Sequence, residues 1–223
     1  MSDKIMSGKK EFIDFMADAG VLTFGDFTTK SGRKTPYFVN TGNYKTGRHI
    51  STLGDYYASL VASSGEKFDA LYGPAYKGIT LAAATASSLY RNYGVDVPYF
   101  FNRKEVKDHG EGGSLVGYKP KDGDRIIIIE DVVTAGTAVR ESLQLLKAVA
   151  DVTVSALFVS VDRMERGTGE RSTLDELRQE YGINVYPIIT ARDIIKSFPD
   201  GDERIAKMEA YLAQYGGRAD VRV

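Results

Sequence analysis

RIIIIEDVVTAGTAVRE, residues 125–141, joins a strongly apolar run to two acids and a turn of small residues. Four consecutive isoleucines are too short a run for a helix and too apolar for a half-exposed strand, so they predict a central parallel strand buried on both faces. Glu130 and Asp131 follow at the point where such a strand would emerge. A turn is expected at residues 134–137 (TAGT), and a helix is expected from residue 138 towards residue 147.

The expected turn at residues 134–137 can hold a phosphate. Its backbone N–H groups and the positive end of the following helix dipole favour an anion. Gly136 lets the backbone approach the phosphate closely, and the threonine hydroxyls add donors. Glu130 and Asp131 cannot serve the phosphate, but they can accept hydrogen bonds from a sugar diol or approach a metal. This pattern predicts a phosphorylated-sugar site at the carboxyl end of a parallel sheet, and the alternative is an ordinary loop with solvated acids.

Expected strands alternate with expected helices through most of the chain, which indicates an α/β fold with a parallel sheet. Besides the isoleucine run, strands are expected at residues 35–40, 68–72, 97–102, 151–162 and 184–190. The other helices are expected at residues 9–19, 51–62, 79 to about 90 and 171–181, and residues 191–214 are expected to form the terminal helices. With 223 residues, the chain can bury a sizeable core as one domain, residues 1–223.

Two further stretches place positive charge beside glycines. GPAYKG, residues 73–78, lies between an expected strand and an expected helix, so it is a second candidate anion site with Lys77 as its cation. RKEVKDHGEGG, residues 103–113, has three glycines beside four potential cations: Arg103, Lys104, Lys107 and His109. We expect this segment to be a mobile loop that delivers positive charge to an anion. The alternatives are a Pro-Gly loop with an exposed lysine and an ordinary charged loop or hairpin arm.

Composition excludes several classes of chemistry. Without cysteine there is no disulfide, thiolate nucleophile or cysteine-ligated zinc, so the H-x-E spacing at residues 109–111 does not predict a zinc deaminase. The net charge of −1 argues against a nucleic-acid-binding surface over the whole molecule. No apolar run reaches the length of a membrane span, and residues 1–15 lack the apolar core of a signal peptide. A cytoplasmic location is therefore expected.

The apolar strand, the two acids and the Thr-x-Gly-Thr turn together resemble the signature of the type I phosphoribosyltransferases. In that family the acids hold the ribose hydroxyls of 5-phosphoribosyl-1-pyrophosphate (PRPP), and the turn holds its 5′-phosphate. Other stretches that occur with this signature are FTTKSGRKTPYF, GPAYKG, FNRKEVKDHGEGGSLVG and VDRMERG. The combination covers roughly residues 20–170 and resembles the bacterial orotate phosphoribosyltransferases.

This resemblance implies a central parallel sheet flanked by helices, with a small hood over the base site to which about residues 1–45 contribute. It implies a glycosyltransferase that converts orotate and PRPP to orotidine 5′-monophosphate and pyrophosphate in the biosynthesis of UMP. Mg²⁺ would be the cofactor, held mainly by the pyrophosphate and ribose hydroxyls of the substrate. The enzyme would be a homodimer in which Lys104 reaches the partner's active site. The peptide bond between Ala75 and Tyr76 would be cis.

The resemblance also implies roles for individual residues. Orotate, whose carboxylate suits a cation, would be surrounded by Lys30, Phe38, Val39, Thr134 and Arg163. PRPP would be bound by Lys30, Tyr76, Lys77, Arg103, Lys104, Lys107, His109, Glu130, Asp131, Val132, Val133, Thr134, Ala135, Gly136, Thr137 and Ala138. The residues expected to act in catalysis are Lys104, Lys107, His109 and Asp131. Family members often carry phenylalanine where this chain has Val39, so orotate affinity depends on whether that position works through its backbone or through ring stacking.

Two alternative functions differ in what they bind. One is a phosphoribosyltransferase that acts on a purine, which the basic loop at residues 103–113 and the stretch SGRKTPYF disfavour. The other is a regulator that keeps this fold but binds RNA. Such a regulator is expected to show a clustered basic face and an RNA affinity that falls steeply with salt.

Overall fold

The computed structural model of the chain describes residues 2–29, 32–104 and 114–218. Helices and strands alternate along most of it, as the sequence predicts. In chain order the elements are α1 (Ser2–Asp18), β1 (Leu22–Thr28), β2 (Lys34–Val39), the short 3₁₀ helix η1 (Thr41–Asn43), α2 (Gly47–Ser64), β3 (Ala70–Gly73), α3 (Lys77–Tyr93), β4 (Tyr99–Asn102), β5 (Leu115–Gly117), β6 (Arg125–Ile129), α4 (Thr137–Val149), β7 (Thr153–Asp162), α5 (Thr173–Tyr181), β8 (Asn184–Thr190), α6 (Ala191–Ser197) and α7 (Glu203–Tyr215).

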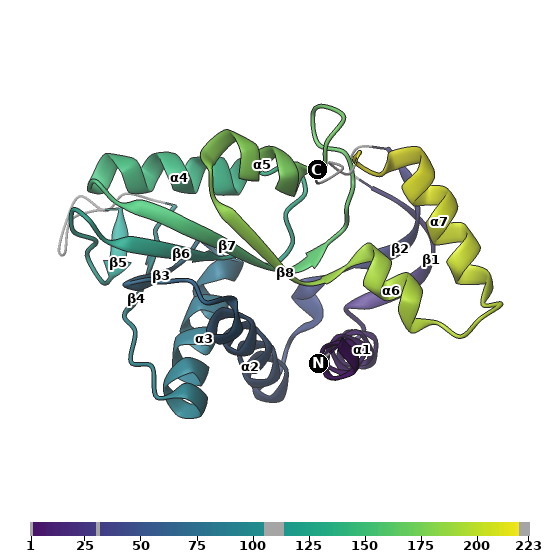
Figure 1. Cartoon of the computed structure of the whole chain (residues 1–223), viewed down its shortest axis with the longest axis horizontal. Helices are drawn as coiled ribbons and strands as arrows, with labels where there is room; N and C mark the ends of the chain where they lie inside the picture. Colours follow the sequence, from purple (N-terminus) through teal and green to yellow (C-terminus); the bar gives the residue numbers. More distant parts are fainter. Residues whose placement is uncertain (1, 30–31, 105–113, 219–223) are drawn as a thin grey trace.

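The larger sheet is mostly parallel and confirms the predicted fold class. Its strand order is β5-β4-β3-β6-β7-β8, and the pairing is parallel throughout except between β4 and β5. Helices α4 and α5 cover one face, and α2 and α3 cover the other (Figure 1). From β3 the chain continues outwards to β4 and β5 on one side of the sheet, and from β6 it continues outwards to β7 and β8 on the other side. The order of the strands therefore reverses between the neighbours β3 and β6.

Strand β6 is buried on both faces, as the isoleucine run predicts. Ile127 and Ile129 belong to the apolar cluster that includes residues of α2 and α3, whereas Ile126 and Ile128 belong to the cluster that includes residues of α4 and α5. All four side chains are fully buried. Because successive side chains of a strand point to opposite faces, only an uninterrupted apolar run can serve both clusters.

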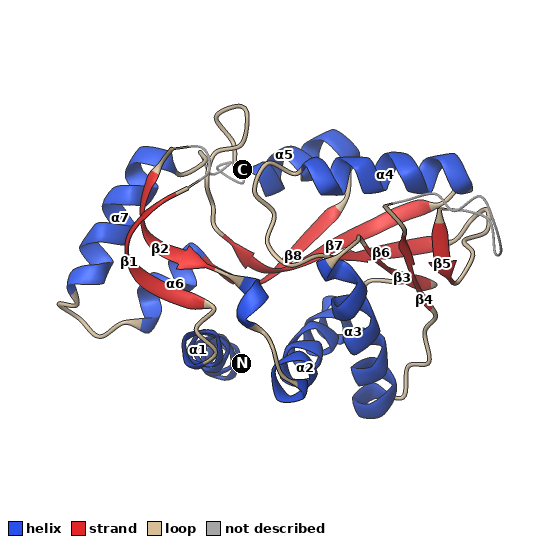
Figure 2. Cartoon of the chain, turned by 180° about the vertical axis from the view of Figure 1, so that it is seen from behind, coloured by secondary structure: helices blue, strands red, loops and turns tan. Residues whose placement is uncertain are grey.

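A second, two-stranded sheet lies at one end of the molecule, together with α1, α6 and α7 (Figure 2). Strands β1 and β2 pair antiparallel, with Leu22 opposite Val39. The buried ring of Tyr37 on β2 meets Tyr211 of α7 edge to face, with 6.2 Å between the ring centroids. The C-terminal helices therefore pack on a sheet that is built from the N-terminal region.

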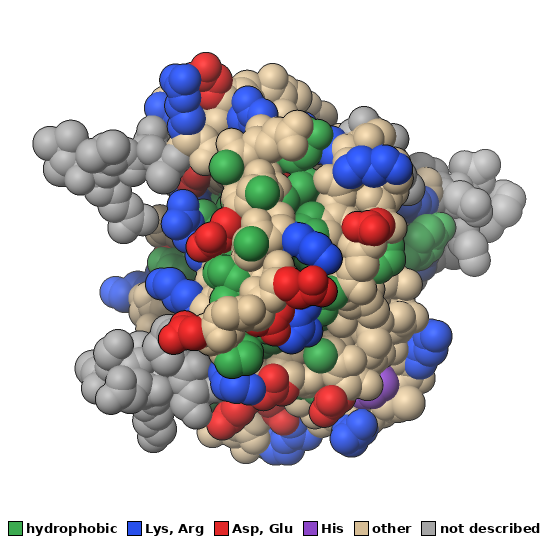
Figure 3. Space-filling view, turned by 90° about the vertical axis from the view of Figure 1, so that its right-hand side faces the viewer, with side chains coloured by type: hydrophobic (Ala, Val, Ile, Leu, Met, Phe, Trp, Pro, Cys, Tyr) green, Lys and Arg blue, Asp and Glu red, His purple; other side chains and the backbone are tan. Residues whose placement is uncertain are grey.

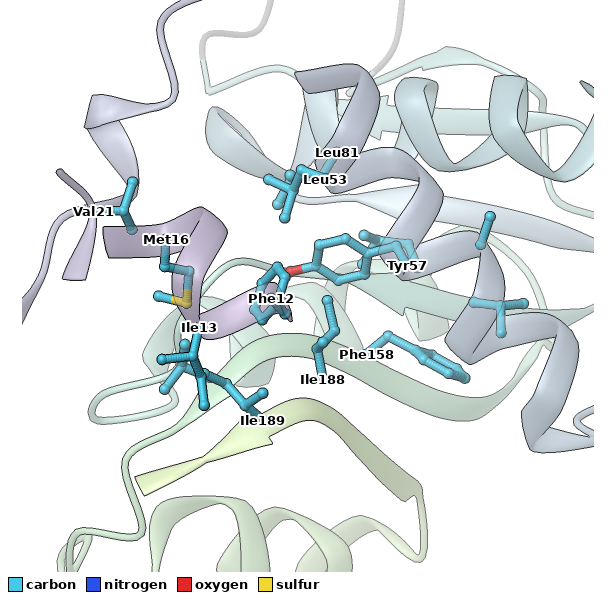
Figure 4. Close-up of a cluster of buried hydrophobic side chains, with 14 of the residues drawn as sticks. Phe12, Ile13, Met16, Val21, Leu53, Tyr57, Leu81, Phe158, Ile188 and Ile189 are labelled. Carbon is cyan, nitrogen blue, oxygen red and sulfur yellow. The ribbon is translucent and has the colours of Figure 1, made fainter. Parts of the chain in front are cut away.

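The apolar core joins this end of the molecule to the larger sheet. Figure 4 shows Phe12 of α1, Tyr57 of α2, Phe158 of β7 and Ile188 of β8 in one buried cluster. Tyr57 also donates a hydrogen bond from its hydroxyl to the carbonyl oxygen of Glu130, at 2.6 Å. This contact anchors the end of β6 in the core. Among the described residues, no helix combines the length and the apolar character that crossing a membrane requires.

Candidate functional site

A pocket of about 340 Å³ opens where β3 and β6 end. These two parallel strands are neighbours, so the segments that follow them meet at the same edge of the sheet. The lining residues are Ala75, Tyr76, Lys77, Glu130, Asp131, Val132, Val133, Thr134, Ala135, Gly136, Thr137, Ala138 and Val139. The structure thus brings together the two anion sites that the sequence predicts separately. It does so at the reversal of strand order, where ligands of open α/β sheets usually bind.

The turn that follows β3 is shaped by close backbone packing. A Cβ atom on Gly78 would lie 3.0 Å from the carbonyl oxygen of Ile129, so glycine lets α3 begin close against β6. The side-chain oxygen of Asn102, at the end of β4, accepts a hydrogen bond from the backbone N–H of Ala75 at 2.8 Å. The peptide bond between Ala75 and Tyr76 is cis, as the resemblance implies.

The turn before α4 leaves the first N–H groups of the helix without a side-chain cap. Gly136 occupies the N-cap position with φ of 76°, a left-handed conformation that favours glycine. Thr173 of α5 donates a hydrogen bond from its hydroxyl to the carbonyl oxygen of Thr134 at 2.6 Å, which ties the turn to the neighbouring helix. The side chains of Thr134 and Thr137 are exposed. Uncapped N–H groups beside two hydroxyls suit a phosphate.

Asp131 is the most connected side chain of the pocket. Its Oδ2 accepts hydrogen bonds from Lys77 Nζ at 2.8 Å and from Thr41 Oγ1 at 2.6 Å. Ser160 of β7 donates from its hydroxyl to the carbonyl oxygen of Asp131 at 2.7 Å. Burial disfavours the charged carboxylate, but the hydrogen bonds from Lys77 and Thr41 outweigh it, so the pKa of Asp131 lies below its ordinary value. Asp131 is therefore an anion at neutral pH.

The pKa of Glu130 is shifted in the opposite direction from that of Asp131. Its carboxyl group is buried, and one oxygen accepts a hydrogen bond from the backbone N–H of Asp131 at 3.0 Å. Burial, followed by the negative charge of Asp131, raises the pKa of Glu130 from its ordinary value of 4.5 to about 8. The negative charge of the pair therefore lies mainly on Asp131, and Glu130 keeps its proton to a higher pH than an ordinary glutamate. Hydroxyl groups can donate to the Asp131 carboxylate and accept from the protonated Glu130.

We expect the stability of the protein to fall with rising pH because of Glu130. Its pKa is higher in the folded state, so the stabilising proton is fully bound below the ordinary pKa of 4.5 and is lost as the pH rises through about 8. Glu130→Gln has no such proton to lose, so its unfolding temperature relative to wild type should increase steadily between these pH values. Thermal unfolding of both proteins across this range measures the difference. If the difference in unfolding temperature between the two proteins stays the same at every pH, the pKa of Glu130 is not raised.

The cations of the basic loop are described only in part. Lys104 is exposed, and its Nζ lies 5.0 Å from the centroid of the Tyr76 ring in the same chain. Arg103 directly follows β4, and its backbone N–H donates to the carbonyl oxygen of Ser114 at 2.8 Å. Lys107 and His109 lie outside the described residues, as does Lys30.

The residues expected around orotate are only partly at the pocket. Thr134 lines it, whereas Phe38, Val39 and Arg163 are not among its lining residues. Phe38 is exposed on β2, and Arg163 follows β7. The guanidinium of Arg163 is paired with Glu165, at 2.6 Å between Nη2 and Oε1, and lies 4.2 Å from the centroid of the Tyr37 ring. The cation that the sequence offers to a substrate carboxylate already has a carboxylate partner within the chain.

Sequence reasoning missed three residues that hold this site together: Thr41, Asn102 and Ser160. Asn102 and Thr41 are polar residues at, or directly after, the ends of expected strands, and that position is a usable signal in an α/β fold. Ser160 lies inside an apolar strand, and nothing in its sequence context distinguishes it from other buried serines.

The described residues do not form a metal site of their own. No group of three or more histidine, aspartate or glutamate side chains among them could hold a metal ion. Mg²⁺ is usually held by one or two carboxylates, water and substrate phosphates. Asp131, whose carboxylate is charged and lies at the pocket, could serve as the single protein carboxylate near such a Mg²⁺ ion.

Comparisons with known proteins agree with this geometry. The family described as "Phosphoribosyl transferase domain" matches residues 41–184. Orotate phosphoribosyltransferases of Clostridium beijerinckii and Lachnoclostridium phytofermentans are 49% and 50% identical to the chain, over 94% and 95% of it and 98% of each relative. The crystal structure of orotate phosphoribosyltransferase from Francisella tularensis has a TM-score of 0.84 and 38% identity, and the match covers 93% of this chain and all of that one. The chain therefore belongs to the phosphoribosyltransferase family and, within it, to the orotate phosphoribosyltransferases.

Proposed function

We propose that this protein transfers the phosphoribosyl group of PRPP to orotate, which yields orotidine 5′-monophosphate and pyrophosphate in cytoplasmic pyrimidine biosynthesis. One observation carries the proposal. The turn that contains Lys77 and the turn at residues 134–137, which follows the acid pair, line the same pocket, and both are candidate anion sites. PRPP, which carries a phosphate on one side of its sugar diol and a pyrophosphate on the other, matches that arrangement. The orotate phosphoribosyltransferases that align with nearly the whole chain support orotate as the acceptor.

PRPP lies across the pocket in this proposal. The 5′-phosphate occupies the turn at residues 134–138, where uncapped N–H groups of α4 and two threonine hydroxyls meet it. The ribose hydroxyls bond to Asp131 and Glu130. The pyrophosphate lies against Tyr76 and Lys77, and Arg103, Lys104, Lys107 and His109 add positive charge. Val132 and Val133 also line the pocket.

Orotate binds beside this pocket, towards the two-stranded sheet. Thr134 belongs to the pocket lining, and Phe38, Val39 and Arg163 approach from the side of β2 and β7. Lys30 is proposed to bind orotate with them. About residues 1–45 act as a hood over the base. Arg163 is paired with Glu165. The carboxylate of a bound orotate therefore either shares the Arg163 guanidinium with Glu165 or displaces Glu165 from it. Val39 is half-buried on β2 and contributes through its backbone in this arrangement.

The reaction needs no side-chain nucleophile. The bond between the ribose C1 and the pyrophosphate oxygen breaks, and its electron pair leaves with the pyrophosphate. The orotate ring nitrogen forms the new bond to C1 and loses its proton to water or to the departing pyrophosphate. Positive charge develops on the sugar, near Asp131, and negative charge develops on the leaving group, near Lys77 and the basic loop. Mg²⁺, held mainly by pyrophosphate and ribose oxygens, supplies further charge neutralisation when bound. The chain contributes chiefly by placing the two substrates and stabilising these charges.

We further propose that the protein is a homodimer in which Lys104 serves the partner's site. The support is the family resemblance and the length of the glycine-containing segment between β4 and β5. Lys104 lies against Tyr76 of its own chain in the structure. Action of Lys104 in the partner's site and action of Lys104 in its own site predict different results when inactive variants are mixed, as argued in the Discussion.

Initial rates with orotate, uracil and hypoxanthine, each with PRPP and Mg²⁺, test the choice of base. We expect turnover with orotate and little with the other two, since neither carries a carboxylate. Preference for hypoxanthine would favour a purine enzyme. On the face shown in Figure 3, lysine and arginine side chains lie among aspartate and glutamate side chains. Tight RNA binding that weakens steeply with salt, without turnover of any base, would instead indicate the regulatory alternative.

A further inference from the structure

Thr41 lies where the smaller sheet meets the pocket. It begins η1, one residue after β2 ends at Val39, and it is half-buried. The side-chain oxygen of Asn40 caps this short helix by accepting from the backbone N–H of Gly42 at 3.2 Å. The position of the Thr41 hydroxyl is therefore set by a compact turn. It is not carried on a long flexible side chain.

The directions of the hydrogen bonds around Thr41 follow from the chemistry of its neighbours. Lys77 carries only donors, and the Asp131 carboxylate carries only acceptors. Thr41 Oγ1 therefore accepts from Lys77 Nζ at 2.7 Å and donates to Asp131 Oδ2 at 2.6 Å. Lys77 also donates directly to Asp131 Oδ2 at 2.8 Å. The three groups form a closed ring of hydrogen bonds.

The backbone N–H of Val132 also hydrogen-bonds to the Asp131 carboxylate, and the two side-chain donors, Lys77 and Thr41, differ in how firmly they are held. The Lys77 side chain is 59% exposed and lies on a long stem, whereas that of Asp131 is only 13% exposed. In the proposed function, on which this inference rests, Lys77 turns to the pyrophosphate of PRPP. Asp131 then loses its mobile partner while it must still face the ribose hydroxyls. Thr41 is placed to remain.

We propose that Thr41 is a positioning residue, which holds the Asp131 carboxylate in the orientation that receives the ribose hydroxyls of PRPP after Lys77 has moved to the pyrophosphate. Thr41 acts through Asp131 and does not itself contact the reacting atoms. Because only Asn40 separates it from β2, Thr41 also ties the sheet proposed to cover orotate to the sugar site.

Thr41→Val removes the hydroxyl and keeps the shape, and Thr41→Ser keeps the hydroxyl. The loss of one hydrogen bond to a charged group predicts that Thr41→Val raises KM for PRPP roughly tenfold. We expect kcat and KM for orotate to stay near the wild-type values, and Thr41→Ser to restore most of the PRPP affinity. Thr80→Val is the matched control, because the exposed Thr80 hydroxyl donates to the backbone carbonyl of Lys77 at 3.0 Å, and the residue lies outside the proposed machinery.

The pH profile gives a second readout that a merely structural role would not move. The titratable groups facing Asp131 are Lys77 of α3, Glu130 beside it and Tyr57 of α2. The Thr41 hydrogen bond favours the charged carboxylate, so its loss raises the pKa of Asp131. In Thr41→Val the acid limb of kcat/KM for PRPP should therefore move to higher pH, and in Thr41→Ser it should not.

The outcomes separate this inference from the proposed function. If the wild type is active and Thr41→Val leaves the KM for PRPP unchanged, the proposed role of Thr41 is wrong, and the proposed function still stands. Equal increases in KM for both substrates, or failure of Thr41→Ser to restore affinity, overturn the role of Thr41 as well. An inactive wild type overturns the proposed function, and calorimetric binding of PRPP to the same variants then decides the role of Thr41. If Thr41→Val does not fold, Thr41→Ala is measured in its place.

Discussion

Asp131→Asn is expected to lower orotate-dependent release of pyrophosphate on the order of 100-fold, as the loss of a group that stabilises transition-state charge typically does. The carboxylate is kept charged by Lys77 and Thr41 at the edge of the pocket. An amide keeps the shape but loses the charge that faces the developing positive sugar. Because Lys77 is largely exposed, removing its partner should change the unfolding temperature only slightly.

Steady-state kinetics and thermal unfolding of the same preparation measure the two effects. Asp69→Asn is a suitable control, because Asp69 pairs with Arg125 at the opposite end of β6, at 2.9 Å, away from the pocket. That variant should keep near-normal kinetics. A large loss of stability with near-normal kinetics in Asp131→Asn would show that Asp131 serves the fold and not the ligand.

Mixing Lys104→Ala with Asp131→Asn is expected to restore activity that neither variant has alone. If Lys104 serves the partner's site, a mixed dimer has one site with both groups intact and one site that lacks both. Random pairing makes about half of the dimers mixed, so about a quarter of wild-type activity should return. Unfolding and refolding the two variants together, followed by an activity assay, measures this recovery.

The control is each variant refolded by itself, which should remain nearly inactive. Mass spectrometry of the intact assemblies confirms that mixed dimers have formed. If Lys104 instead serves its own subunit, beside Tyr76, every site in the mixture carries one lesion. No recovery in the presence of mixed dimers would therefore exclude the cross-subunit assignment.

The central sheet could be predicted from sequence because its physical signal is local. A run of isoleucines has few structural alternatives when both faces of a strand are buried, and the structure places the four side chains in two separate clusters. The turns that follow β3 and β6 were recognisable for the same reason. Glycine, small residues and a helix start occur together in each of them within a few positions.

Strand β1 was not predicted because its sequence opposes the assignment. Gly25 and Asp26 interrupt LTFGDFT, and both residue types are depleted in strands. The structure accommodates them with a shift of register between Phe24 and Phe27. Pairing with β2, and packing of the Phe24 ring against the Phe198 ring with 5.1 Å between their centroids, stabilise a strand that its own propensity does not support. Strand β5, with only three residues, carries too little pattern to be recognised alone.

The parts of the site that sequence did not predict depend on contacts between distant residues. Thr41 meets Asp131 across 90 positions of the chain, and no local pattern indicates that contact. The partner of Arg163 is close in sequence, at Glu165, but their pairing depends on how the chain turns after β7. An arginine after a strand could equally have been left free for a ligand. The sequence indicates which chemical groups are available, and the fold decides which of them already have partners.

Orotate-dependent release of pyrophosphate from PRPP by the wild-type protein with Mg²⁺ tests the central claim most directly. The account predicts that pyrophosphate and orotidine 5′-monophosphate appear in equal amounts, and that both are nearly absent when orotate is omitted or Asp131 is replaced by asparagine. PRPP that remains intact in the presence of orotate, or pyrophosphate release that is unaffected by Asp131→Asn, would contradict it.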